Sequence, residues 1–318
     1  MRVLVIKLGA LGDFAQAFAA FSRIRNAHVG DEITLLTTPP YESLAHASGL
    51  FDRIETDGRP KGFLATLKLF SRLRRAGYGR VYDLQTSSRT RWFILGFLPK
   101  PPEWSGISPG ASHRQRRRDR DAMHNLDRMA DQLHVAGIGP AYEAGQAPPA
   151  YLGWAAKAIA VDGLMARLGL KAPFAMLAPG ASAVKPEKLW PITSYVALAQ
   201  ALAKAGLHVA VVGGPAETPL YARIAAQAPA TLDLTGKTSL VELAALGTRA
   251  AVAVGNDSGP THLLAYAGAP GVMLMSKVTD PNHCGPRGRM SWLKADDLHD
   301  VSVEAVLEAC LKAMEAAG

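Results

Sequence analysis

The sequence predicts an α/β protein made of two doubly wound, Rossmann-like domains with a cleft between them. Apolar runs typical of buried strands alternate with helical segments, and the second half of the chain repeats this alternation. Such alternation is typical of a parallel sheet covered by helices on both faces. A stretch rich in Gly, Pro and Ala at 137–153 separates the halves, and 318 residues suit two domains of about 150 residues each. We therefore expect domains at 1–152 and 153–318, with the last helix on its own domain or packed back on the first.

The first domain begins with a buried strand that runs into a glycine-containing turn. Its expected strands are 2–7, 32–38 and 81–87, and its expected helices are 14–27, 61–77 and 123–137. After Pro99 the pattern becomes irregular up to about residue 122.

The second domain starts with a helix and then alternates regularly. Its expected strands are 173–178, 208–214, 231–236, 250–257 and 270–276, and its expected helices are 154–168, 192–205, 219–227, 240–246, 260–267 and 303–316. Open parallel sheets bind ligands beyond the carboxyl ends of their strands, so the turns that follow these strands are the candidate sites.

Positive charge is concentrated in the first half. The net charge is +8, and residues 59–120 contain 15 Lys and Arg against 3 Asp and Glu. This indicates an anionic partner, which could be a nucleic acid, an acidic membrane surface or an acidic substrate, or else a solvated basic face. The arginine-rich run lacks the interleaved aromatic residues that stack on bases, which disfavours nucleic acid.

The remaining composition indicates a cytoplasmic protein. Lys7 and Asp13 interrupt the apolar N-terminus, which disfavours a signal peptide, and no run approaches the ~20 apolar residues of a spanning helix. Cys284 and Cys310 form no metal or disulfide pattern. The helix that carries Phe63, Leu67 and Phe70 together with basic residues could either rest on an anionic membrane or pack as an ordinary surface helix.

Two turns carry the clearest candidates for chemistry at their helix starts. In "KLGALGD", Asp13 could be a general base or a helix N-cap. In "APGASAVKPEKLWP", Ser182, Lys185 and Lys188 precede a helix and could form an anion site or an exposed basic loop.

Two further turns follow strands of the second domain. In "VVGGPAE", Glu217 could accept hydrogen bonds from ribose hydroxyls or cap a helix. In "GNDSGPTH", Asp257 and Ser258 stand at a strand end, where Gly259 would allow a ligand to approach the amides of the next helix. His262, considered alone, is more typical of a histidine packed within a helix. Because these turns share one sheet edge, together they predict a pocket for a phosphate-bearing ligand.

The motifs "KLGALGD", "APGAS…KLWP", "GGPAE", "TGKTSLVELAAL" and "GNDSGPTHLLAYAGAP…TDP" resemble, in order and spacing, those of the family 9 glycosyltransferases. These are the heptosyltransferases of lipopolysaccharide core assembly, and the resemblance spans nearly the whole chain. It implies the two-domain GT-B fold and an inverting transfer from an ADP-activated heptose without metal or cofactor. Gln16, where many members have His, and "MSKVTDP" depart from the family pattern.

The resemblance also implies roles for individual residues. Asp13 matches the catalytic base, Lys188 the phosphate-binding lysine and Glu217 the ribose-binding acid. The residues expected to bind the donor are Ser182, Lys188, Glu217, Thr238, Asp257, Ser258, Gly259, Pro260, Thr261 and His262. The N-terminal domain would hold an acidic lipopolysaccharide-core glycolipid, with possible contact to the inner membrane surface.

The residues expected to bind that acceptor are basic. They are Lys7, Arg89, Arg91, Arg114, Arg116, Arg117 and Arg118. Two alternatives stay open from sequence: a sugar-nucleotide epimerase or hydrolase with the same two-domain fold, and a non-enzymatic nucleic-acid-binding protein.

Overall fold

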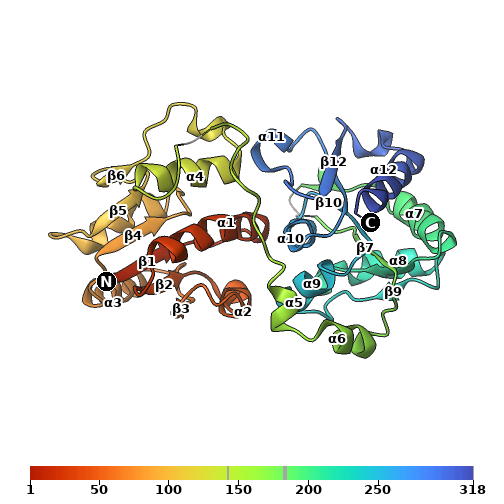
Figure 1. Cartoon of the computed structure of the whole chain (residues 1–318), viewed down its shortest axis with the longest axis horizontal. Helices are drawn as coiled ribbons and strands as arrows, with labels where there is room; N and C mark the ends of the chain where they lie inside the picture. The colour runs from red at the N-terminus through yellow and green to blue at the C-terminus, as the bar shows by residue number, and fades with distance from the viewer. Residues whose placement is uncertain (142, 182–184, 318) are drawn as a thin grey trace. The chain divides into compact units, whose positions relative to one another are not determined.

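The computed structural model describes residues 1–141, 143–181 and 185–317 (Figure 1). The chain divides into two compact units, Met1–Ala150 and Tyr151–Gly318. Each unit is built around a six-stranded sheet in which every neighbouring pair of strands is parallel, and helices flank the sheet (Figure 1).

The first unit has the strand order β3-β2-β1-β4-β5-β6. The strands are β1 (Arg2–Ile6), β2 (Glu32–Leu36), β3 (Arg53–Glu55), β4 (Arg80–Asp83), β5 (Glu103–Gly106) and β6 (His113–Arg114). The α-helices are α1 (Leu11–Ala27), α2 (Glu42–Ala47), α3 (Phe63–Arg75) and α4 (Asn125–Val135), and the 3₁₀ segments are η1 (Pro39–Tyr41), η2 (Thr90–Phe97) and η3 (Arg120–Ala122).

Aromatic packing holds α1 in the core of the first unit. Phe14, Phe18 and Phe21 are buried on one face of the helix. Their rings meet edge to face, with centroids 5.3 to 5.7 Å apart. Because α1 is anchored in this way, its first turn is fixed at the carboxyl end of β1.

Three strands of the first unit were not expected from sequence. β5 and β6 lie in the stretch predicted to be irregular, and β3 follows α2. They have only two to four residues and begin with Glu103, His113 and Arg53, so no apolar run identifies them.

The second unit has the strand order β12-β11-β10-β7-β8-β9. The strands are β7 (Phe174–Ala178), β8 (His208–Val211), β9 (Leu232–Asp233), β10 (Val252–Asn256), β11 (Gly271–Met275) and β12 (Met290–Lys294). The α-helices are α5 (Ala155–Ala158), α6 (Val161–Leu168), α7 (Ile192–Lys204), α8 (Thr218–Ala225), α9 (Leu240–Gly247), α10 (Gly259–Ala267), α11 (Pro281–Cys284) and α12 (Val303–Glu315), and the 3₁₀ segments are η4 (Pro186–Lys188), η5 (Pro215–Glu217) and η6 (Leu298–Asp300).

Two features of the second unit differ from the expectation. The single helix expected at 154–168 is two helices, because the backbone is extended at Ile159 and a new helix starts after Ala160. The edge strand β12 was missed, since its Trp292 is exposed and the strand lacks a buried run.

The last helix, α12, packs against α7 and β11 of its own unit, where Val306 and Cys310 join the core.

The two sheets share one topology. Numbered in chain order within each unit, both read 3-2-1-4-5-6, the doubly wound arrangement. The strand order reverses between β1 and β4 in the first unit and between β7 and β10 in the second. Ligands of such sheets bind outside the carboxyl ends of the strands at this reversal point, and the polar residues described below lie there.

Candidate functional site

Four hydrogen-bonded polar side chains meet where β10 ends. Oδ1 of Asp257 lies 3.0 Å from Nε2 of His262, and Oδ2 accepts a hydrogen bond of 2.9 Å from Oγ1 of Thr279. Nζ of Lys188 donates to the same Oδ2 atom in an ion pair. Burial acts to raise the pKa of Asp257, but the bonds from His262 and Lys188 outweigh it and hold the pKa well below its usual range. Asp257 is therefore a fixed negative charge that orients Lys188.

The N-terminus of α10 adjoins this group. Ser258 is the N-cap, yet its side chain makes no capping bond to the helix backbone, and its Oγ atom lies 3.0 Å from Oγ1 of Thr261. Thr261 in turn donates to the carbonyl of Asn256. Gly259 and Pro260 form the first turn. A helix N-terminus of this kind favours an anion, because amide groups point outward and the helix dipole is positive there.

Asn256 holds the lysine-bearing segment against β10. Its buried Oδ1 atom accepts hydrogen bonds from the backbone of Trp190 (3.1 Å) and from Oη of Tyr195 (3.2 Å). Its Nδ2 atom donates to the carbonyl of Pro179 (2.8 Å). The sequence analysis assigned no role to this asparagine, which fixes the loop that follows η4 and so helps place Lys188.

Glu217 lines a small pocket beside the same helix. The pocket has a volume of about 110 Å³ and is lined by Ala178, Gly180, Ala181, Val212, Gly213, Glu217, Ser258 and Pro260. A Cβ atom at Gly180 would lie 2.5 Å from Cγ of Glu217, and one at Gly213 would lie 2.9 Å from its Cβ. Because both positions are glycine, the side chain of Glu217 can lie close to the backbone at Gly180 and Gly213.

The structure thus brings together Lys188, Glu217 and the residues from Asp257 to His262 among those expected to bind the donor. Ser182 lies outside the described residues. Thr238 lies directly before Ser239, the N-cap of α9. Lys185, the other candidate for the phosphate, is exposed.

A second polar group lies at the start of α1 in the first unit. Asp13 is in the first helical turn, but the N-cap is Ala10, which makes no side-chain capping bond, so the N-cap alternative for Asp13 is wrong. Oδ1 of Asp13 instead accepts a hydrogen bond of 3.0 Å from Nδ2 of Asn125, the first residue of α4. Sequence reasoning missed Asn125.

Lys7 and Asp83 lie beside Asp13 at the ends of β1 and β4. Nζ of Lys7 donates to the carbonyl of Leu84 at 3.3 Å. Burial lowers the pKa of Lys7, while the charges of Asp13 and Asp83 act to raise it. Burial raises the pKa of Asp83 to about 6, although backbone amides of Thr86 and Gln85 donate to its Oδ1 atom. This end of the first sheet is a buried, polar and partly charged centre.

The expected acceptor-binding arginines differ in what they contact. Arg117 pairs with Asp119, and Arg116 and Arg118 are exposed in the same segment. Arg114 lies in β6 and is half-buried.

The other two expected arginines lie at η2. Arg89 is exposed directly before it. Arg91 stacks over the ring of Trp92 at 5.1 Å. Two arginines that were not expected, Arg128 and Arg120, act on Lys7 by their charge, and Nη2 of Arg120 donates to Oγ1 of Thr86 at 2.5 Å.

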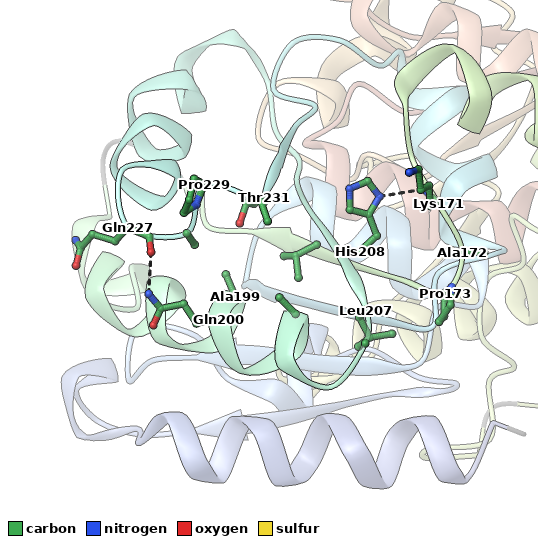
Figure 2. A pocket seen from close by; sticks show the side chains of 15 residues that line it. Lys171, Ala172, Pro173, Ala199, Gln200, Leu207, His208, Gln227, Pro229 and Thr231 are labelled. Atoms are coloured by element: carbon green, nitrogen blue, oxygen red, sulfur yellow. Dashed lines mark hydrogen bonds between the residues drawn. The ribbon is translucent and has the colours of Figure 1, made fainter.

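A larger pocket, of about 640 Å³, lies at the amino ends of strands in the second sheet, opposite the carboxyl ends described above (Figure 2). It opens where β7 and β8 begin, since Pro173 and His208 line it. Its polar groups bond to each other: Lys171 donates its backbone amide to Nδ1 of His208, and Gln200 donates to the carbonyl of Gln227. Volume alone does not make this apolar pocket the reaction site, because ligands of such sheets bind at the carboxyl ends of the strands.

In the part of the chain that the structure describes, no three His, Cys, Asp or Glu side chains are grouped to hold a metal ion. Nor does any helix of that part have the length and apolar character needed to cross a membrane.

Comparison with known proteins identifies the family. Residues 66–294 match glycosyltransferase family 9 (heptosyltransferase), which is most of the chain. The chain belongs to glycosyltransferase family 9. It is 25% identical over 283 residues to the lipopolysaccharide core heptosyltransferase OpsX of Haemophilus influenzae, covering 84% of this chain and 76% of that protein.

Solved structures of a family 9 glycosyltransferase and of two heptosyltransferases show the same fold. The family 9 glycosyltransferase of Veillonella parvula superposes with a TM-score of 0.83 at 20% identity, over 99% of this chain and 97% of that one. ADP-heptose lipopolysaccharide heptosyltransferase II of E. coli superposes with a TM-score of 0.80 at 18% identity, over 100% and 99%. E. coli heptosyltransferase WaaC with ADP gives 0.76 at 18% identity, over 98% and 100%.

These comparisons confirm the predicted fold class, GT-B, and the predicted enzyme class. The chain is a glycosyltransferase of the heptosyltransferase family. The alternatives of an epimerase or hydrolase and of a non-enzymatic nucleic-acid-binding protein are set aside.

Proposed function

We propose that this family 9 glycosyltransferase transfers heptose from ADP-heptose to an acidic glycolipid of the lipopolysaccharide core, with inversion at the anomeric carbon and without a metal ion. One observation carries the proposal: an oriented lysine and a free helix N-terminus lie together at the reversal point of the second sheet. Relatives named as ADP-heptose and lipopolysaccharide core heptosyltransferases support the same donor and acceptor.

The second unit would hold the donor. Lys188 and the amides at the start of α10 would bind the diphosphate, Glu217 would accept hydrogen bonds from the ribose, and Thr238 would flank the adenine. Asp257 would contact the sugar while it holds Lys188 in place. Ser182 would add a hydroxyl to the diphosphate. When the sugar leaves, negative charge grows on the diphosphate, and these preorganised positive groups stabilise it without a metal.

The first unit would supply the base and hold the acceptor. Asp13 takes the proton of the acceptor hydroxyl as that oxygen bonds to the anomeric carbon. The bond from this carbon to the diphosphate oxygen breaks, and its electron pair leaves with ADP. A single displacement of this kind inverts the anomeric configuration. Lys7 and the arginines at 89, 91, 114 and 116–118 would meet the acid groups of the acceptor.

The same unit would contact the cytoplasmic face of the inner membrane through a surface that we name the α3–η2 surface. Its exposed apolar side chains are Phe63, Leu64 and Leu67 of α3 with Trp92, Leu95 and Leu98 at η2. Trp92 and Leu95 are three residues apart in η2 and so share one face of the 3₁₀ helix, and Leu98 follows directly as its C-cap. Exposed lysines at 61 and 68 and Arg75 add positive charge, as in surfaces that bind anionic bilayers.

This surface differs in one detail from the sequence expectation. Phe70, expected beside Phe63 and Leu67, instead packs edge to face on Phe93 of η2 with ring centroids 5.3 Å apart. That contact joins α3 to η2.

The decisive experiment compares single-turnover heptose transfer by wild type and Asp13→Asn at saturating donor and acceptor. Loss of the base should lower the rate by ~10²-fold or more while leaving the melting curve and ADP affinity unchanged. Transfer within a few-fold of wild type would refute the role of Asp13. Calorimetry with ADP, with and without EDTA, tests the donor: binding that needs a metal, or that is seen only with UDP, would refute it.

A further inference from the structure

We propose that Asn125 is a positioning residue that holds the carboxylate of Asp13 for proton transfer, an inference that rests on the proposed role of Asp13 as the base. The two residues are 112 positions apart, and the packing of α1 against α4 brings them together. Nδ2 of Asn125 donates to Oδ1 of Asp13 at 3.0 Å. No other described residue hydrogen-bonds to this carboxylate.

The hydrogen bonds of Asn125 fix the orientation of its amide. The second hydrogen of Nδ2 goes to Oε1 of Gln16 at 2.9 Å, and Oδ1 accepts from Nη2 of Arg128 at 2.6 Å. A flipped amide would place its oxygen against the oxygens of Asp13 and Gln16 and its NH₂ group against the Arg128 guanidinium. The network therefore allows one orientation, in which the donor faces the base.

This arrangement occupies one oxygen of the carboxylate and leaves the other for the substrate. Because Asn125 holds Oδ1, Oδ2 of Asp13 stays available to accept the proton of the acceptor hydroxyl. Asn125 also stands between Asp13 and the guanidinium of Arg128, so the base is held by a neutral amide rather than by a direct ion pair. Displacement of a reacting group by about 1 Å can lower the rate ~10²-fold. A hydrogen bond from Asn125 that fixes the carboxylate of Asp13 therefore favours a high rate of transfer.

The test uses Asn125→Asp, which keeps the size of the side chain but faces Asp13 with an acceptor. Two carboxylates this close take up a proton more readily than one alone. We expect the acidic limb of the pH–rate profile of single-turnover transfer to move to higher pH by about one unit or more, and the rate at pH 7 to fall ~10- to 100-fold. The charged or titratable groups that interact with Asp13 are Lys7 and Tyr41, and those that interact with these two are Asp83, Arg120, Arg128 and Arg59; none of them is altered.

Two further variants keep the test decisive. Asn125→Leu removes the donor without adding charge, so it should lower the rate ~10-fold or more while the affinity for ADP stays unchanged. Asn26→Asp makes the same chemical change at the exposed far end of α1 and should leave both rate and pH profile as in wild type. Melting curves and calorimetry with ADP show that each variant is folded.

The outcomes separate this inference from the proposed function. If Asp13→Asn is inactive but Asn125→Asp and Asn125→Leu both transfer heptose within a few-fold of wild type, with the acidic limb unmoved, then Asn125 does not position the base. If Asp13→Asn itself retains activity, the proposed base is wrong, whatever the Asn125 variants do.

Discussion

Replacing Lys188 with methionine should weaken the binding of ADP much more than the binding of adenosine. Nζ of Lys188 carries three N–H donors, and among the described residues one of them is engaged, by Asp257. Two donors therefore remain for a diphosphate. The side chain is only 14% exposed, so water screens its charge little.

The magnitude follows from the strength of one charged contact. A hydrogen bond to a charged group contributes about 1.5–3 kcal/mol, which corresponds to a loss of ADP affinity of ~10- to 150-fold. Adenosine lacks the diphosphate, so its affinity should change less than about two-fold. Asp257 keeps its bonds to His262 and Thr279 in the variant, so the second unit should remain folded.

Isothermal calorimetry with ADP and with adenosine measures both affinities on the same protein. Lys185→Met is the matched control, because Lys185 is exposed three residues earlier and should leave both affinities as in wild type. An unchanged ADP affinity in Lys188→Met, or an equal loss for adenosine, would refute the assignment of the phosphate to Lys188. A loss in Lys185→Met alone would transfer that role to Lys185.

Three other predictions concern packing, pH and the α3–η2 surface. Gly255→Ala should destabilise the second unit by ~1–3 kcal/mol in chemical denaturation and weaken ADP binding, since the new Cβ would lie 2.3 Å from Oγ1 of Thr261 at the start of α10; a stability equal to wild type would contradict this. Folding raises the pKa of Asp83 to about 6, and an acid with a raised pKa favours the native state only while protonated, so stability is lost as pH rises through that value. Relative to Asp83→Asn, the unfolding free energy of wild type should fall by roughly 2.5 kcal/mol between pH 4 and 7, since the loss of ~1.4 kcal/mol per pH unit ends near the folded pKa of about 6, and a difference that does not vary with pH would refute it. Trp92→Ser combined with Leu95→Ser should reduce co-sedimentation with vesicles of anionic phospholipid several-fold without changing ADP affinity; undiminished sedimentation would exclude this surface as the membrane contact.

The fold was largely predictable because its main strands are buried on both faces. In a parallel sheet covered by helices, central strands such as β1 and β7 appear in the sequence as continuous apolar runs. Strand β5 and the edge strands β6 and β12 carry charged or exposed residues, and their pairing with a neighbour defines them rather than their own composition.

The polar group at the end of β10 was predictable for a related reason. Asp257, Ser258 and His262 are close in sequence and follow one strand, so a local motif places them together. Lys188 is 69 residues from Asp257, but it lies in the turn after β7, the strand next to β10. Because the carboxyl ends of neighbouring parallel strands lie side by side, the two segments could be predicted to lie close together.

The first unit shows where this reasoning stops. Asp13 could be proposed from its turn, but its partner Asn125 lies on α4, which is not the helix that follows β1 or β4. Their contact depends on how α4 packs against α1, and no turn motif encodes that packing angle. Arg120 likewise reaches Thr86 across 34 residues of chain that include the unexpected strands β5 and β6. Sequence reasoning can identify site residues in the turns that follow parallel strands, because these turns meet at one end of the sheet. Residues that reach the same place from a packed helix can be identified only from the three-dimensional structure. Arg128 is an example, because it lies on α4 and reaches the site through its hydrogen bond to Asn125.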